Sequence, residues 1–108
     1  MPWLCRGEEV LASAEVADTR RTRRRGLLGC DSVEGALVLT PARAVHTLGM
    51  RFDLDVAYLD REGVVVDAHT MRRHRVGLPR WRARSVVEAE AGAFARWQLR
   101  AGDRLEVR

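Results

Sequence analysis

A β-hairpin predicted over residues 54–68 constrains the fold of this chain more than any other feature. Residues 54–59 and 64–68 are apolar runs of strand length, and a polar turn of residues 60–63 joins them. Gly63 can adopt the positive φ that a bulged hairpin turn requires. In the first strand Leu54, Val56 and Tyr58 face one side of the sheet, so Asp55 faces the other.

The rest of the chain alternates short strand patterns with two short helices. Apolar residues recur at every second position of residues 9–16, which predicts the strand that opens the sheet. Asp18 and Thr19 are both competent N-caps for a helix that ends in the turn of residues 26–29. The other predicted elements are a strand at 35–39, a loop at 42–53, an exposed connection at 71–83, a strand at 85–89, a helix at 92–98 and a strand at 105–107. Together they predict one α+β domain over residues 1–108, with a mostly antiparallel sheet.

Length and composition exclude several classes of protein. At 108 residues, with 46% hydrophobic and 31% charged residues, the chain has the composition of a globular domain with one core. No apolar run approaches the ~20 residues of a membrane helix, and the N-terminus does not resemble a signal peptide. We therefore expect a cytoplasmic protein without membrane contact. Cys5 and Cys30 lack the spacing of metal ligands, and we expect neither a metal nor a cofactor.

A formal net charge of +4 raises the question of nucleic-acid binding. All 19 basic residues are arginine, a bias that a GC-rich genome produces without selection for binding. Residues 72–84 combine six arginines with Trp81, a mixture that can hold single-stranded nucleic acid through phosphate contacts and stacking. We expect Trp81 to pack against the sheet instead, and any nucleic-acid binding to be weak and non-specific.

A compact polar cluster in residues 46–55 is the candidate site. Its donors, acceptors and charges of both signs could converge on one small cleft. The predicted ligand-binding residues are His46, Thr47, Met50, Arg51 and Asp55, with Arg25 projecting from the end of the first helix. In this interpretation Asp55 orients His46 or accepts a hydrogen bond from the ligand. The alternative is structural: His46 and Asp55 satisfy buried backbone groups, Met50 fills the core, and Arg25 stabilises a helix end.

Three segments of the chain resemble a family of small bacterial and archaeal proteins. The first carries Ala17-Asp18-Thr19 and Arg25-Gly26-Leu27-Leu28-Gly29, the second carries His46-Thr47-x-x-Met50-Arg51-Phe52-x-x-Asp55-Val56-x-x-Leu59-Asp60 and Glu62-Gly63-x-Val65, and the third carries Val87-Glu88-Ala89-Glu90-Ala91-Gly92 and Ala101-Gly102-Asp103. In this order they are similar to the signature of the family called domain of unknown function 192. The resemblance implies a compact α+β domain with a partly open barrel of strands. It implies no activity, since the family is named for lacking an assigned one.

The sequence predicts a non-catalytic accessory module that binds a small polar ligand or a protein partner in a cleft between His46 and Asp55. One alternative is a small enzyme in which these two residues perform acid–base chemistry. The other is nucleic-acid binding through the arginines of residues 20–25 and 72–84. We assign no catalytic residue, because no nucleophile motif is present. Glu88 and Glu90 share a strand face, and we expect them to be rim charges or capping groups.

Overall fold

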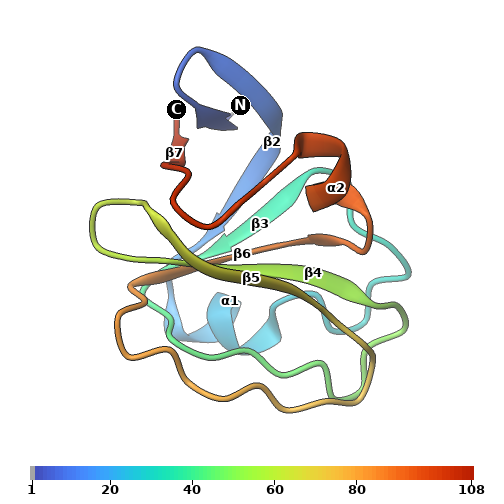
Figure 1. The fold of residues 1–108 in the computed structure, drawn as a ribbon. Helices are drawn as coiled ribbons and strands as arrows, with labels where there is room; N and C mark the ends of the chain where they lie inside the picture. Colours follow the sequence, from blue (N-terminus) through green and yellow to red (C-terminus); the bar gives the residue numbers. More distant parts are fainter. Residues whose placement is uncertain (1) are drawn as a thin grey trace.

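The computed structural model describes residues 2–108 and places seven strands in one sheet of order β5-β4-β6-β3-β2-β1-β7 (Figure 1). In chain order the elements are β1 (Trp3–Arg6), β2 (Glu9–Ala17), α1 (Arg20–Arg25), β3 (Ala36–Leu39), β4 (Leu54–Leu59), β5 (Val65–Met71), β6 (Ser85–Glu90), α2 (Ala93–Trp97) and β7 (Glu106–Val107). Neighbouring strands are antiparallel except β2 and β3. α1 lies in the crossover between these two, because parallel neighbours cannot be joined by a tight turn. The α+β class, the mostly antiparallel sheet and the two short helices are confirmed.

β2 pairs with β1 along its first half and with β3 along its second half, residues 14–17. The prediction that residues 9–16 open the sheet is wrong, because residues 3–6 form β1 although the run is too short to show a clear alternation. β5 and β7, at the two ends of the strand order, are connected at their flanks by an isolated bridge between Val64 and Arg104. This bridge lies outside both strands, so the sheet does not close into a barrel.

Each face of the sheet has its own apolar core. The even-numbered residues of β4 belong to one core, whereas Ala57 and Leu59 belong to the other, which confirms the predicted alternation. Phe94 of α2 packs into the Ala57 core, while Leu27 and Met50 pack into the opposite one. We call these sides the α2 face and the α1 face, and Figure 1 shows the two helices on opposite sides of the central strands. The loop of residues 42–53 therefore covers the α1 face.

Local turn and cap chemistry agrees with the sequence. Thr19 caps α1, since its Oγ1 accepts a hydrogen bond of 3.1 Å from the backbone N–H of Thr22. Gly63 has a φ of +83°, and its N–H donates to the carbonyl of Asp60 at 3.0 Å while the N–H of Asp60 donates to the carbonyl of Val64 at 2.9 Å, as expected for a bulged turn. β5 continues to Met71, three residues beyond its predicted end. Within residues 2–108, neither helix has the length and apolar character that crossing a membrane would need.

Candidate functional site

A small pocket on the α1 face collects several of the predicted site residues. It is lined by residues 23–28 at the end of α1, by His46 and Met50 of the 42–53 loop, and by Glu88 of β6. Its volume is about 50 Å³, enough for roughly one or two water molecules at ~30 Å³ each. The three segments that carry the family resemblance each contribute to this wall. We call this cavity the Glu88 pocket.

Glu88 is the buried carboxyl of this pocket. It sits in the middle of the sheet, opposite Leu37 on one side and Val56 on the other, and is 4% exposed. Its Oε1 has no hydrogen-bond partner within residues 2–108. Burial raises the pKa of Glu88 to about 7, because removing a carboxyl from water penalises its charged form. Near neutral pH this group can therefore either accept a hydrogen bond as a carboxylate or donate one as an acid.

Between α1 and Glu88 the pocket is lined by Gly26 and by the arginines at the end of the helix. A Cβ added at Gly26 would lie 3.8 Å from Oε1, so the turn backbone comes close to the carboxyl. Arg25 and His46, both exposed, line the mouth of the same pocket. No ion pair joins Glu88 to a cation of residues 2–108. The structure thus brings Arg25, His46 and Met50 together, and their role in binding a ligand stays a prediction.

Asp55 lies on the other side of the sheet. Its Oδ2 accepts hydrogen bonds of 3.0 Å from the backbone N–H groups of Gly92 and Phe94, and its Oδ1 accepts one of 2.6 Å from the Thr70 hydroxyl. Asp55 therefore caps the start of α2, where backbone N–H groups have no partner within the helix. The predicted cleft between His46 and Asp55 is not formed, because the loop that carries His46 packs on the α1 face.

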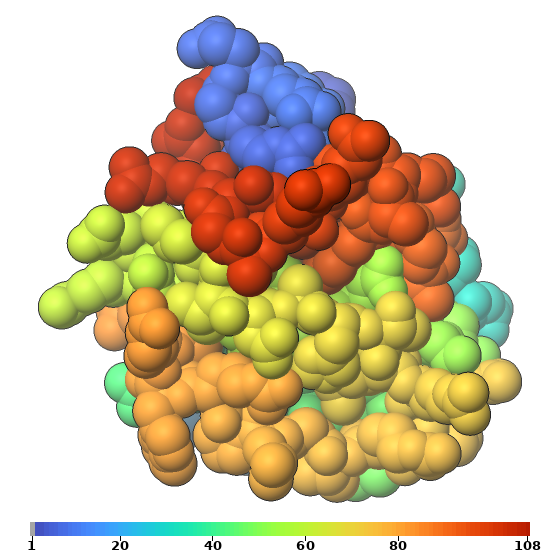
Figure 2. Space-filling view, viewed as in Figure 1, coloured from blue at the N-terminus to red at the C-terminus, as the bar shows by residue number. Residues whose placement is uncertain are grey.

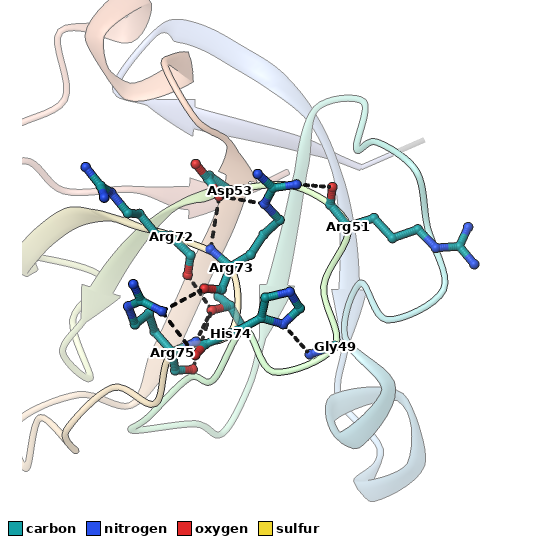
Figure 3. A network of polar contacts seen from close by, with 8 residues as sticks. Gly49, Arg51, Asp53, Arg72, Arg73, His74 and Arg75 are labelled. Carbon is teal, nitrogen blue, oxygen red and sulfur yellow. Dashed lines mark hydrogen bonds and ion pairs between the residues drawn. The ribbon is translucent and has the colours of Figure 1, made fainter.

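Thr47 is part of a structural network that ties the loop to the segment after β5. Figure 3 shows its partners Arg72, His74 and Arg75. The Thr47 hydroxyl donates to the carbonyl of Arg72 at 2.6 Å and accepts from the N–H of Arg75 at 2.9 Å. Its own carbonyl accepts from the N–H of His74 at 2.8 Å, and Nδ1 of His74 accepts from the N–H of Gly49 at 3.3 Å. Thr47 is fully buried with these partners, so the structure supports the structural alternative for this residue.

Arg51 points away from this network (Figure 3). Its guanidinium forms an ion pair of 2.6 Å with Asp31, and both side chains are largely exposed. Such surface pairs contribute about 0–1 kcal/mol to stability. Arg51 does not line the Glu88 pocket.

The sequence interpretation missed Glu88 and misplaced Trp81. Glu88 was expected to be a rim charge, yet it lies in the run of residues 86–89, which is buried throughout. A carboxyl inside an otherwise apolar strand run is the signal that could have found it. Glu90 does lie at the rim, where it pairs with Arg96 at 2.8 Å. Trp81 is 76% exposed, whereas Ala83, 2% exposed, belongs to the core of the α1 face.

The matching family model and two archaeal relatives carry no function in their names. The model of the family domain of unknown function 192, described as "Uncharacterized ACR", matches residues 4–107. A UPF0127 protein of Thermococcus gammatolerans is 36% identical over 95 residues, covering 82% of this chain and 62% of that protein. A UPF0127 protein of Thermococcus kodakarensis is 31% identical over 104 residues, covering 91% and 66%. The chain thus spans slightly less than two thirds of the length of these two relatives.

Two crystal structures share the fold. A protein of unknown function from Novosphingobium aromaticivorans matches with a TM-score of 0.77 and 19% identity, covering 88% of this chain and 74% of that one. A Sinorhizobium meliloti protein, named as a candidate transcription regulator, matches with the same score and identity over 87% and 80%. At 19% identity these likenesses show the fold alone. The match over residues 4–107, together with the archaeal relatives, shows that the chain belongs to the domain of unknown function 192 family.

Proposed function

We propose that this chain is a non-catalytic module that binds the polar end of a small ligand or of a protein partner in the Glu88 pocket. The observation that carries the proposal is the buried Oε1 of Glu88, which has no partner within residues 2–108. An unsatisfied buried polar atom costs about 1–3 kcal/mol. A ligand that donates an N–H or O–H to this oxygen removes that cost, so the fold favours an occupant of that kind.

The size and rim of the pocket restrict the chemistry of the ligand. A volume of about 50 Å³ admits only a terminal group such as an ammonium, an amide or a hydroxyl. The rest of the ligand would lie at the mouth, beside Arg25 and His46. The Arg25 guanidinium favours a carboxylate or phosphate there, because its planar fork donates two parallel hydrogen bonds. A donor at one end and an anionic group at the other is the chemistry of a small zwitterion or of a peptide end.

A small enzyme is the second candidate, and one observation favours it. A carboxyl whose pKa is about 7 can give and take a proton near neutral pH, which is what general acid–base catalysis requires. In this version Glu88 replaces the His46–Asp55 pair that the sequence suggested. Nucleic-acid binding, the third possibility from the sequence, concerns a different surface, around Trp81.

Methyl NMR of the methionines tests the binding proposal. Met50 lines the Glu88 pocket, whereas Met71 belongs to the same core and lines none of the pockets described in this structure, so it serves as an internal control. Glycine and glycinamide, which carry an N–H donor, should shift the Met50 methyl signal and leave Met71 unchanged. Acetate has no hydrogen-bond donor near neutral pH, so it should have a smaller effect.

Variants of the same strand make the NMR test specific. Glu88→Leu removes the acceptor and should abolish the Met50 shift, while Glu90→Gln, which changes a rim carboxylate, should leave it intact. The proposal fails if neither donor probe moves Met50 at millimolar concentration, or if Glu88→Leu responds like the wild type. Turnover of an added substrate that is lost in Glu88→Gln would favour the enzyme.

A further inference from the structure

Four arginines surround an exposed tryptophan in a second, larger pocket. This pocket has a volume of about 650 Å³ and lies between the β4–β5 turn and the segment that leads into β6. Its lining residues are Arg43, Arg61, Arg82 and Arg84, with Trp81, Ala83, Asp60 and Glu62. In Figure 1 the turn and the segment before β6 lie next to each other at the left edge, and Figure 2 shows both on the surface of this view. We call this the Trp81 pocket.

The four arginines of the Trp81 pocket outnumber the two acidic residues of its wall. None of its four arginines forms an ion pair with a carboxylate of residues 2–108. The hydrogen bond from the Val64 N–H is the main cause that lowers the pKa of Asp60, and the nearby Arg82 lowers it further, so Asp60 offsets part of the positive charge. Asp60 accepts the N–H groups of Glu62 and Val64 at 2.8 and 3.0 Å, and Glu62 pairs with Arg104 at 3.2 Å. Arg43 Nε donates to the carbonyl of Ala83 at 3.3 Å, and the remaining N–H groups of the four guanidiniums are available to an anion from outside.

The segment that carries Trp81 is held in place by backbone hydrogen bonds on both sides. The N–H of Arg84 donates to the carbonyl of Leu59 at 2.7 Å, and the carbonyl of Arg84 accepts from the N–H of Ala42 at 2.9 Å. One turn earlier, the N–H of Arg80 donates to the carbonyl of Arg43 at 2.8 Å. The indole of Trp81 is nevertheless 76% exposed. A large aromatic ring is thus presented to solvent on a fixed support.

We propose that the Trp81 pocket binds single-stranded nucleic acid, with one base stacked on Trp81 and the adjacent phosphates held by the surrounding arginines. Stacking on aromatic side chains combined with a positively charged groove is how proteins bind single strands without reading the sequence. A duplex hides its base faces, so it cannot use Trp81. An acidic peptide offers charge to the arginines but no base. The Glu88 pocket takes no part in this binding.

Fluorescence anisotropy of a labelled oligothymidylate tests the proposal. A length of ~12 nucleotides falls within the range of about 4–16 nucleotides that single-strand binding sites cover. Trp81→Ala should weaken binding at least about fivefold, since stacking is worth about 1–3 kcal/mol per base. Trp81→Phe keeps an aromatic face and should bind within a few-fold of the wild type. The logarithm of the association constant should fall with the logarithm of salt with a slope of about −3, for four phosphates at 0.7 each.

Charge-matched variants separate this pocket from general attraction. The double variant Arg82→Ala/Arg84→Ala should reduce the salt slope by about 1.4. The control Arg20→Ala/Arg21→Ala removes the same charge from α1 and should leave the effect of Trp81→Ala unchanged. Thermal melts establish that each variant is folded, as expected for exposed side chains.

Several outcomes would overturn the proposal. One is equal binding of the single strand and of a duplex of the same length. Another is competition by polyglutamate as strong as that by unlabelled oligothymidylate, which would point to an acidic protein. Unchanged affinity in Trp81→Ala would leave only non-specific attraction. Binding of thymidine 5′-monophosphate as tight as that of the oligonucleotide would assign the pocket to a free nucleotide.

Discussion

Replacing Glu88 by glutamine should change how the stability of this protein depends on pH. Burial raises the pKa of Glu88 from 4.5 to about 7, so between these pH values the folded state holds a proton that the unfolded state has lost. The free energy of unfolding therefore falls as the pH rises from about 4.5 to about 7, and Glu88 contributes no further change above that range. Each pKa unit corresponds to 1.36 kcal/mol, so the loss amounts to about 3 kcal/mol. Glutamine keeps the shape of the side chain and has no charge to desolvate.

Urea unfolding of the wild type and of Glu88→Gln between pH 4 and pH 8 measures this effect. Groups that titrate in both proteins cancel in the difference, which should shift by about 3 kcal/mol in favour of the variant as the pH rises. Glu90→Gln is the matched control, because this carboxylate lies two residues along the same strand and is half exposed. Glu88 is intact in this control, so the loss of stability between pH 4.5 and about pH 7 should remain. A curve for Glu88→Gln that runs parallel to the wild type would refute the reasoning, since it would mean that Glu88 titrates like an exposed carboxyl.

Asp55, Thr47 and Gly63 hold backbone segments in place, and urea unfolding tests each of them. Asp55→Ala should cost at least about 1–3 kcal/mol, because it leaves two N–H groups at the start of α2 without their acceptor, and an effect below this range would contradict the capping role. Thr47→Val should cost a similar amount while Thr47→Ser costs less, and equal losses would show that the hydroxyl does not matter. Gly63→Ala should destabilise the protein more than Gly29→Ala. Both glycines have a φ of +83°, but only at Gly63 would a Cβ collide with the Leu105 carbonyl oxygen. Equal losses of stability would show that this collision does not matter.

The sequence predicted those parts of the fold that depend on local periodicity and turn chemistry. The alternation of β4 identified which of its side chains share a face, and Gly63 marked the hairpin turn. The parallel pairing of β2 with β3 was not predicted, because it joins residues on either side of a crossover and leaves no short-range pattern. β1 was missed for a related reason, since its four residues gain their stability from β2 and β7 rather than from their own sequence.

The candidate site was predicted only in part, because its geometry depends on which face the loop covers. His46 and Asp55 are close in the sequence, and that closeness suggested one cleft. A strand, however, sends successive side chains to opposite faces, so a residue at the start of β4 can lie far from the loop before it. Arg25, His46 and Met50 line one pocket, but the carboxyl of that pocket is Glu88, from a strand later in the chain. Only a long-range pairing between β4 and β6 puts it there.

The titration of Glu88 itself is the most direct measurement of the site. Carboxyl carbons of glutamate can be followed by ¹³C NMR as the pH is changed, and Glu88→Gln assigns the signal by its disappearance. We expect the Glu88 signal to titrate at about pH 7 and to move when glycine binds. A Glu88 signal that titrates near 4.5 and ignores the ligand would contradict both the burial of an unpartnered carboxyl and the pocket built around it.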